Sequence, residues 1–274
     1  MPKIKTRDGT ELYVKDWGSG RPVVLMHGWP LTADTWDDFA NVAAENGFRA
    51  IAYDRRGFGR SDQPWDGYDY DTLSDDLADV MQATGVTADA TLIGFSMGGG
   101  EVARYMSRHA GRGVSKAALV GSVVPYMLKT DDNPHGVSQS VFDGMAEGMT
   151  KDRANFFADF FKSFYGVGMF TGSVSDEVLD WSFNQAMTAG LKPTLACAKA
   201  FASTDFRPDL PHFKVPTLVI HGTGDQTVPI ETSGRAAAAA IPGAKLIEYD
   251  GAPHGLFASN KEELTQDLMT FLRS

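Results

Sequence analysis

Residues 91–100, TLIGFSMGGG, place a serine between a strand-forming run and a segment with helical spacing. The run Thr91-Leu92-Ile93 is typical of a buried strand, and residues 99–109 are expected to form a helix. A G-x-S-x-G pattern in this setting predicts a sharp turn that lifts the serine hydroxyl out of the sheet. Glycine has no Cβ and leaves room for the backbone of such a turn. Ser96 is therefore the candidate nucleophile.

Two later segments each place a titratable side chain in a loop after a strand. The run 217–220, TLVI, leads into His221-Gly222-Thr223-Gly224-Asp225, which makes Asp225 the candidate acid. The strand-like run 245–249 leads into Asp250-Gly251-Ala252-Pro253-His254-Gly255, which makes His254 the candidate base. The order Ser, Asp, His along the chain is that of the α/β-hydrolases and differs from the chymotrypsin and subtilisin orders.

Acyl transfer to a serine needs all three groups. A serine hydroxyl is a weak nucleophile at neutral pH, so a neutral His254 would accept its proton and later return it to the leaving group. An ionised Asp225 would orient the imidazole and stabilise the cation that forms. The alternative is that Asp225 only caps a helix that begins near Val228 and that His254 is an ordinary loop residue.

An anion site is expected beside the serine. The run 22–26, PVVLM, predicts a buried strand, and His27-Gly28-Trp29-Pro30 forms the loop after it. A backbone N–H of this loop can face the serine, so the N–H groups of Trp29 and Met97 are the candidate oxyanion hole. His27 precedes the tight turn, and its side chain is expected to point away from the pocket in a structural role.

Strands alternate with helices along most of the chain. An alternating segment, 10–17, should pair with an earlier strand as an edge hairpin. The short apolar runs typical of buried parallel strands are 23–26, 50–53, 91–95, 117–120, 217–221 and 246–249. The segments with helical spacing are 36–46, 70–84, 99–109, 231–240 and 260–272. This alternation predicts an α/β fold, a doubly wound and mostly parallel sheet that binds ligands beyond the carboxyl ends of its strands.

The strand signals stop between about residues 127 and 214. This segment is expected to be a mostly helical cap, inserted into a core domain formed by residues 1–126 and 215–274. Its composition is rich in phenylalanine, methionine and small polar residues. The single cysteine, Cys197, is expected to be buried in a helix and cannot form an internal disulfide.

An aromatic run in the cap, 156–165 (FFADFFKSFY), is too rich in rings for one helix face. Phe156, Phe160 and Phe164 share one face, and the other rings share another. One face should pack on the cap while the other lines an apolar acyl or aryl pocket, with Phe160 and Phe164 as lining residues. The alternative is that both faces are core. Trp29, Pro30 and Val228 complete the residues expected to contact substrate.

Taken together, the motifs closely resemble those of the cofactor-free haloperoxidase and aryl esterase group of α/β-hydrolases. They are HGWP at 27–30, DRRGFGRSD at 54–62, GFSMGGG at 94–100, HGTGD at 221–225 and APHG at 252–255. The resemblance covers nearly the whole chain and weakens between about residues 127 and 214. It implies an α/β-hydrolase fold and a Ser-His-Asp mechanism on small carboxylic esters.

The resemblance also implies a second reaction. Members of the group can use hydrogen peroxide in place of water to deacylate the serine, which makes a peracid that oxidises bromide or chloride, and they use no metal or haem. Proline fixes its own backbone angle and biases the preceding residue towards an extended conformation, so Pro30 would set the direction of the Trp29 carbonyl. Our hypothesis is that this carbonyl accepts a hydrogen bond from bound peroxide. The alternative is that Pro30 only shapes the turn.

Rival functions on the same fold differ in their nucleophile or in their turnover. Epoxide hydrolases and haloalkane dehalogenases share the His-Gly-Trp-Pro type of loop, but they place aspartate where this chain has Ser96. A carbon–carbon bond hydrolase or a lactonase or lactamase would also use the serine, and the motifs do not exclude them. A non-catalytic hydrolase-like receptor with a complete triad is a further alternative.

Composition narrows the choice of partners and location. The net charge of −10 argues against nucleic acid and anionic membranes. The first residues, MPKIK, run directly into a strand without the apolar stretch of a signal peptide, and no run reaches the roughly 18 apolar residues of a membrane span. A cytoplasmic enzyme is expected, and the resemblance suggests a homo-oligomer.

Overall fold

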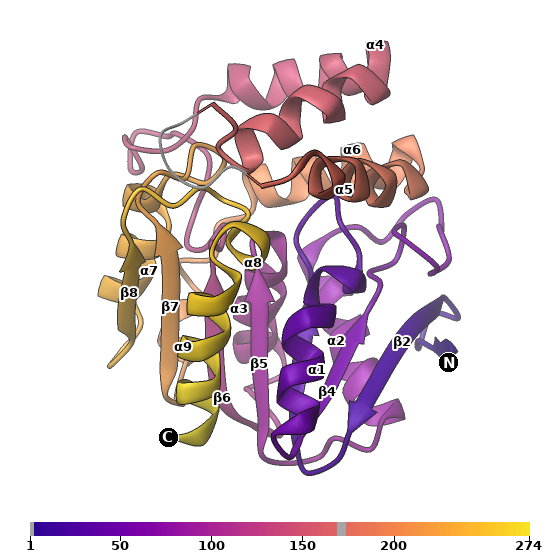
Figure 1. The fold of residues 1–274 in the computed structure, drawn as a ribbon, viewed down its shortest axis with the longest axis vertical. Coiled ribbons are helices and arrows are strands. Elements are labelled where there is room, and N and C mark those ends of the chain that lie inside the picture. The colour runs from indigo at the N-terminus through magenta and orange to yellow at the C-terminus, as the bar shows by residue number, and fades with distance from the viewer. Residues whose placement is uncertain (1–2, 169–173) are drawn as a thin grey trace.

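A twisted sheet forms the centre of the computed structural model, which describes residues 3–168 and 174–274 (Figure 1). In this part of the chain the sheet has eight strands in the order β1-β2-β4-β3-β5-β6-β7-β8. The strands are β1 (Lys3–Lys5), β2 (Glu11–Gly18), β3 (Arg21–Met26), β4 (Phe48–Tyr53), β5 (Ala90–Phe95), β6 (Val114–Val120), β7 (Thr217–Gly222) and β8 (Lys245–Tyr249). Strands β3 to β8 are parallel, so the expected α/β class is confirmed.

The first two strands form the expected hairpin, with Ile4 opposite Leu12. The hairpin's second strand is not the edge, however, because β2 also pairs antiparallel with β4, where Lys15 lies opposite Ala52. The edge is the three-residue β1. The central strand β5 is buried along its whole length, as a strand covered on both faces must be.

Helices cover both faces of the sheet. In Figure 1, α1 and α9 lie in front of the strands, and α2 and α3 lie behind them. The core helices are α1 (Asp37–Glu45), α2 (Tyr70–Ala83), α3 (Met97–Arg108), α7 (Gly234–Ala240), α8 (Leu256–Ser259) and α9 (Lys261–Arg273). The helix expected over residues 231–240 is shorter than predicted, because a 3-10 turn at Ile230–Thr232 ends at Ser233, whose φ of −127° and ψ of −92° are not helical.

Three further helices lie above the carboxyl ends of the strands (Figure 1). They are α4 (Gln139–Phe164), α5 (Asp176–Thr188) and α6 (Leu191–Ser203), all within the segment expected to form the cap. Cys197 is buried inside α6, as predicted. Helix α4 is kinked at Asp152, where φ is −156° and ψ is 88°. The Asp152 carboxylate accepts a 3.0 Å hydrogen bond from the Asn155 N–H and so caps the second half of the helix.

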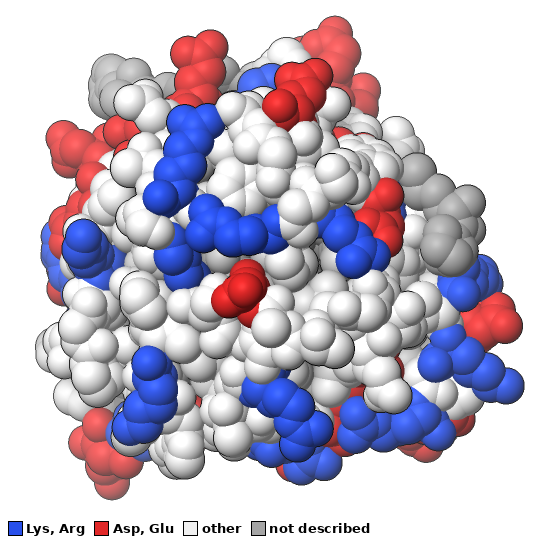
Figure 2. Space-filling model, turned by 90° about the horizontal axis from the view of Figure 1, so that it is seen from below, with Lys and Arg blue, Asp and Glu red and all other residues white. Residues whose placement is uncertain are grey.

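Basic side chains are present on one face of the molecule although the chain is acidic overall, with a net charge of −10. The end of the molecule opposite α4, α5 and α6 shows scattered lysine and arginine side chains on a mostly uncharged surface, with acidic side chains mainly toward its rim (Figure 2). Across residues 3–168 and 174–274, no helix combines the length and apolarity that crossing a membrane requires.

Candidate active site

The candidate nucleophile lies at the turn between β5 and α3. Ser96 has a φ of 53° and a ψ of −118°. A positive φ is a left-handed backbone conformation that residues other than glycine rarely adopt. The Ser96 N–H donates a 2.9 Å hydrogen bond to the Val120 carbonyl on the neighbouring strand β6. The Ser96 carbonyl accepts bonds from the N–H groups of Gly99 and Val123. Backbone bonds on both sides thus hold the strained residue in place.

The glycines around Ser96 leave room for the backbone of the turn, as predicted. Neither Gly94 nor Gly98 has a positive φ, so the unusual conformation belongs to the serine itself. A Cβ on Gly94 would lie 2.4 Å from the Gly98 carbonyl oxygen, and one on Gly98 would lie 2.5 Å from the Met26 carbonyl oxygen. A Cβ on Gly99 would lie 2.0 Å from the Ser122 Oγ. The glycines are required because the start of α3 packs directly on the strands.

The three candidate catalytic side chains form one hydrogen-bonded chain. The Nε2 atom of His254 lies 2.9 Å from the Ser96 Oγ, and its Nδ1 lies 2.5 Å from an Asp225 carboxylate oxygen, Oδ2. Asp225 follows β7, and His254 follows β8. The other Asp225 oxygen accepts hydrogen bonds from the N–H groups of Thr227 and Val228, at 2.9 and 2.8 Å. The carboxylate therefore caps its own turn and also holds the imidazole.

The charge state of the acid follows from its neighbours. Burial alone would raise the pKa of Asp225, but its electrostatic interaction with His254 and the hydrogen bonds from His221 and His254 hold that pKa well below its usual range. Asp225 is 4% exposed and His254 is 1% exposed. A buried carboxylate that stays ionised can stabilise an imidazolium beside it.

Two aromatic rings enclose the candidate base. The His254 ring lies 5.0 Å from the Phe95 ring and 4.8 Å from the Phe164 ring, measured between centroids. The Gly255 N–H donates a 2.9 Å hydrogen bond to the Phe164 carbonyl, which ties the end of α4 to the loop of the base. These contacts limit the orientations open to the imidazole.

The loop after β3 lies directly against the nucleophile. A Cβ on Gly28 would be 3.0 Å from the Cβ of Ser96. Among the described residues, none accepts a hydrogen bond from the Trp29 or Met97 N–H, and none donates to the Trp29 carbonyl. The Trp29–Pro30 peptide bond is cis. Two uncommitted N–H groups at the expected positions are suitable donors for an oxyanion.

A buried ion pair supports this loop from behind. The Arg55 guanidinium contacts the Glu101 carboxylate of α3 and donates a 2.5 Å hydrogen bond to the His27 carbonyl. The Arg55 N–H donates to the His27 Nε2 at 2.9 Å. Burial, together with the nearby Arg55 charge, lowers the pKa of His27 well below its ordinary value, so the ring is neutral. This agrees with the structural role predicted for His27.

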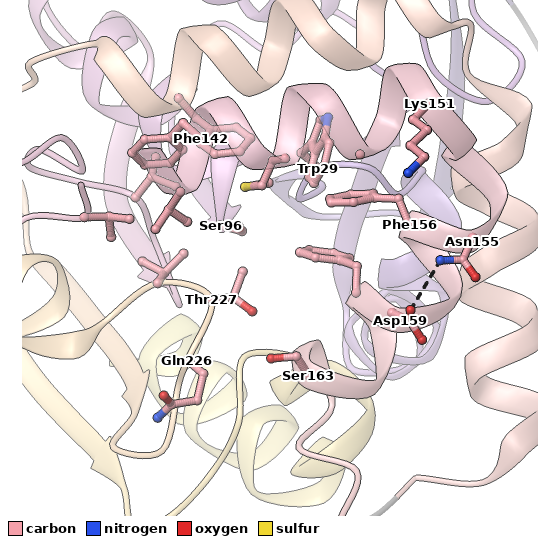
Figure 3. A pocket seen from close by; sticks show the side chains of 18 of the residues that line it. Trp29, Ser96, Phe142, Lys151, Asn155, Phe156, Asp159, Ser163, Gln226 and Thr227 are labelled. Atoms are coloured by element: carbon pink, nitrogen blue, oxygen red, sulfur yellow. Dashed lines mark hydrogen bonds between the residues drawn. The ribbon is translucent and has the colours of Figure 1, made fainter. Parts of the chain in front are cut away.

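A mostly apolar cavity of about 570 Å³ opens beside Ser96 (Figure 3). Trp29, Phe160 and Val228 line it, as expected. The prediction for Phe164 is wrong, because helix α4 ends at that residue and its buried ring packs on His254 instead. Pro30 is not among the residues that line the cavity either. Phe156, on the same face as Phe160, does line it, so that helix face is divided between pocket and core.

Polar side chains from the second half of α4 and its kink lie along one side of the cavity (Figure 3). Asn155 donates a 3.5 Å hydrogen bond to Asp159, which also forms a 3.0 Å ion pair with Lys162. Lys151 lies on the same side (Figure 3), and Asp152 is also among the lining residues. Trp29, Phe156 and Phe160 contribute apolar rings to the same lining, so the cavity suits an apolar group with a polar end.

The sequence did not predict a role for His221, which lies near the candidate acid Asp225. His221, at the end of β7, is fully buried and lies 3.2 Å from the Asp225 carboxylate. Its position four residues before the acid was the only signal in the sequence. Such spacing does not predict a contact, because the turn between the two residues determines whether they meet.

The fold and the site together define a hydrolase with a serine at a strand–helix turn. The profile of the alpha/beta hydrolase fold matches residues 21–261. The chain therefore belongs to the α/β-hydrolase fold family.

Within that family, the chain is similar to non-heme haloperoxidases and esterases over its whole length. It is 43% identical to a non-heme chloroperoxidase from Kitasatospora aureofaciens, over 99% of each chain. It is 42% identical to a bifunctional esterase/perhydrolase from Acinetobacter calcoaceticus, over 100% of each chain. The crystal structure of a bromoperoxidase from Bacillus anthracis superimposes with a TM-score of 0.95 at 41% identity, covering 100% of this chain and 99% of that one. The suspected group is confirmed.

Proposed function

We propose that this protein is a serine hydrolase that cleaves small carboxylic esters and can pass the acyl group to hydrogen peroxide. The observation that carries the proposal is the unbroken chain of contacts from Asp225 through His254 to Ser96, at 2.5 and 2.9 Å. A neutral imidazole at this distance from a hydroxyl is placed to act as its general base.

The reaction begins when Ser96 Oγ attacks the ester carbonyl and its proton passes to the His254 Nε2. The negative charge that develops on the carbonyl oxygen is met by the N–H groups of Trp29 and Met97, and each such donor is typically worth about 2.7–4 kcal/mol. The C–O bond to the leaving group then breaks, and His254 returns the proton to the departing alcohol. An acyl group remains on Ser96 as an ester.

Deacylation determines which product forms. When water attacks, His254 removes its proton and the products are a carboxylic acid and free Ser96. When hydrogen peroxide attacks, His254 removes its proton and one peroxide oxygen becomes bonded to the acyl carbon. The bond from that carbon to Ser96 Oγ breaks, Ser96 takes back the proton, and the product is a peracid. The peracid transfers an oxygen atom to bromide or chloride, which yields hypohalous acid and a carboxylate. The names of the relatives support this second reaction.

The test compares the wild-type protein with Ser96→Ala. Hydrolysis of 4-nitrophenyl acetate should fall by at least about 10⁴-fold, because the nucleophile is lost while the anion site remains. Mass spectrometry after treatment with a fluorophosphonate should find the added group on Ser96. Halide oxidation should require an acyl donor, an ester or a carboxylic acid, together with peroxide, and should disappear in the same variant.

The matched control is Ser140→Ala, which removes an exposed serine hydroxyl on α4 and should leave both reactions unchanged. Ester hydrolysis that survives in Ser96→Ala would contradict the proposal. An unlabelled Ser96 with no turnover would favour the receptor alternative, and turnover of a lactone or a vinylogous diketone without turnover of aryl esters would favour the other hydrolase classes.

A further inference from the structure

His221 makes two contacts through a single nitrogen. Its Nε2 lies 2.8 Å from the Val228 carbonyl oxygen and 3.2 Å from the Asp225 Oδ2. A carbonyl oxygen can only accept a hydrogen bond, so Nε2 carries the proton and donates to both oxygens. The ring Nδ1 is buried and has no partner among the described residues.

The surroundings keep this histidine in one form. A Cβ added to Gly234 of α7 would lie 2.8 Å from the His221 Nδ1, so the backbone of α7 closes that side of the ring. Protonation of Nδ1 would bury an unpaired N–H together with a positive charge, which is costly. The contacts therefore place the donated proton on Nε2.

The two carboxylate oxygens of Asp225 accept hydrogen bonds from different donors. Oδ1 accepts the backbone N–H groups of Thr227 and Val228. Oδ2 accepts His254 at 2.5 Å and His221 at 3.2 Å. Both ends of the turn from Asp225 to Val228 are thus attached to His221, which itself projects from the rigid strand β7.

We infer that His221 is a positioning residue for the catalytic acid: it fixes the Asp225–Val228 turn to the sheet and withdraws part of the negative charge that Asp225 presents to His254. This inference rests on the proposed function, because it concerns the protonation of the proposed base. His221 does not line the cavity and touches no substrate position.

Removal of the His221 N–H donor should shift the pH dependence of the reaction in a predictable direction. Without His221, more negative charge stays on the Asp225 Oδ2, and this charge stabilises the protonated form of His254. His254 must be neutral to accept the Ser96 proton. The acid limb of the kcat/KM profile should therefore move to higher pH, by about half to one unit.

Among the described residues, the other charged or titratable groups near His221 come from β8, α7 and two loops. Glu248 of β8 lies opposite His221 in the sheet, and it pairs with Arg235 of α7 at 2.6 Å. The loop after β7 contributes Asp225, and the loop after β8 contributes His254. The Glu248–Arg235 pair lies at the surface, so Glu248→Gln should leave the acid limb in place and serves as a control for general electrostatic effects.

The test uses two side chains of nearly equal size and flexibility. His221→Met removes the donor, whereas His221→Gln keeps an N–H that can reach the Val228 carbonyl and Asp225. The measurement is the pH dependence of kcat and KM for 4-nitrophenyl acetate hydrolysis. His221→Met should shift the acid limb upward and lower the plateau kcat about tenfold with KM unchanged, and His221→Gln should restore the wild-type midpoint.

A purely structural role would lower the amount of active enzyme without moving the midpoint. The midpoint of the acid limb does not depend on the concentration of active enzyme, so it can be measured even in a partly unfolded preparation. His221→Ala, which removes the donor without steric demand, should show the same shift as His221→Met. An unmoved midpoint in both donor-free variants, or an equal shift in His221→Gln, would overturn the inference. Absence of Ser96-dependent hydrolysis in the wild-type protein would instead refute the proposed function.

Discussion

Ser96 shows how much of the site depends on one residue's backbone. Its left-handed φ of 53° costs of order 1–3 kcal/mol in a residue with a side chain. Bonds to Val120, Gly99 and Val123 compensate by fixing the peptide groups on both sides. The result is a hydroxyl that stands at the end of β5 within reach of His254, where an unstrained strand end would direct it along the sheet.

At the same scale, Pro30 should affect the choice between water and peroxide. We predict that Pro30→Leu lowers the ratio of perhydrolysis to ester hydrolysis several-fold, because a residue other than proline leaves the Trp29 carbonyl less well oriented to accept a bond from peroxide. Both rates are measured in one preparation, by peracid formation and by 4-nitrophenyl acetate cleavage. Pro242→Leu, at an exposed position near β8, is the control. A ratio that stays constant in Pro30→Leu would remove the peroxide role of this carbonyl.

At the scale of elements, helix α3 approaches the strands more closely than a helix with ordinary side chains could. Its first turn contains three consecutive glycines, 98–100. The same helix carries Glu101, which pairs with Arg55 at the end of β4 and so connects the nucleophile turn to the loop of the oxyanion donors. Close packing and one buried ion pair thus join β3, β4, β5 and α3 around the serine.

We predict opposite effects for two glycine-to-alanine changes in helices. Gly98→Ala should lower the free energy of unfolding by about 3 kcal/mol, because the new Cβ would lie 2.5 Å from the Met26 carbonyl oxygen. Gly144→Ala in α4 should raise it by about 0.5–1 kcal/mol, since nothing lies within 4 Å and alanine favours a helix. Urea denaturation followed by circular dichroism measures both. Equal shifts in the two variants would show that helix propensity, not contact with β3, decides the cost.

At the scale of the whole molecule, Trp29 links the core to the helices above it. Its indole N–H donates a 3.0 Å hydrogen bond to the Thr194 carbonyl of α6. Its ring lies 5.6 Å from Phe157 and 5.5 Å from Phe201, which belong to α4 and α6. The backbone of the same residue supplies a proposed oxyanion donor. The position of the upper helices and the position of that donor are therefore coupled through one side chain.

The cavity between core and upper helices should limit the size of the acyl group. We predict that Phe160→Ala raises the ratio of kcat/KM for 4-nitrophenyl octanoate to that for the acetate by about tenfold, because it opens apolar space, and each buried CH₂ is worth about 0.8 kcal/mol. The control is Phe271→Ala on α9, which is far from the cavity. A ratio unchanged by Phe160→Ala would mean that the acyl chain lies elsewhere.

Most strands and core helices were predictable because buried strands and amphipathic helices leave a repeating apolar pattern. The triad residues were predictable for a related reason: each follows a strand whose apolar run is clear, and the carboxyl ends of parallel strands meet at one edge. The position of Phe164 was not predictable from the sequence. The same helix face lines a cavity at Phe156 and Phe160, but one turn later it packs on the ring of a histidine. Periodicity shows which side chains share a face and cannot show what lies opposite.

The amino-acid sequence by itself determined the alternation of strands and helices, the order of Ser96, Asp225 and His254, and the glycines that let α3 meet the sheet, because these follow from local pattern and residue chemistry. Only the tertiary structure decided that His221 shares the Asp225 carboxylate, that Arg55 and Glu101 support the Trp29 loop, and which aromatic rings face the cavity. Those contacts join residues from different strands, loops and helices. Their geometry is set by how whole elements pack, which no local stretch of sequence encodes.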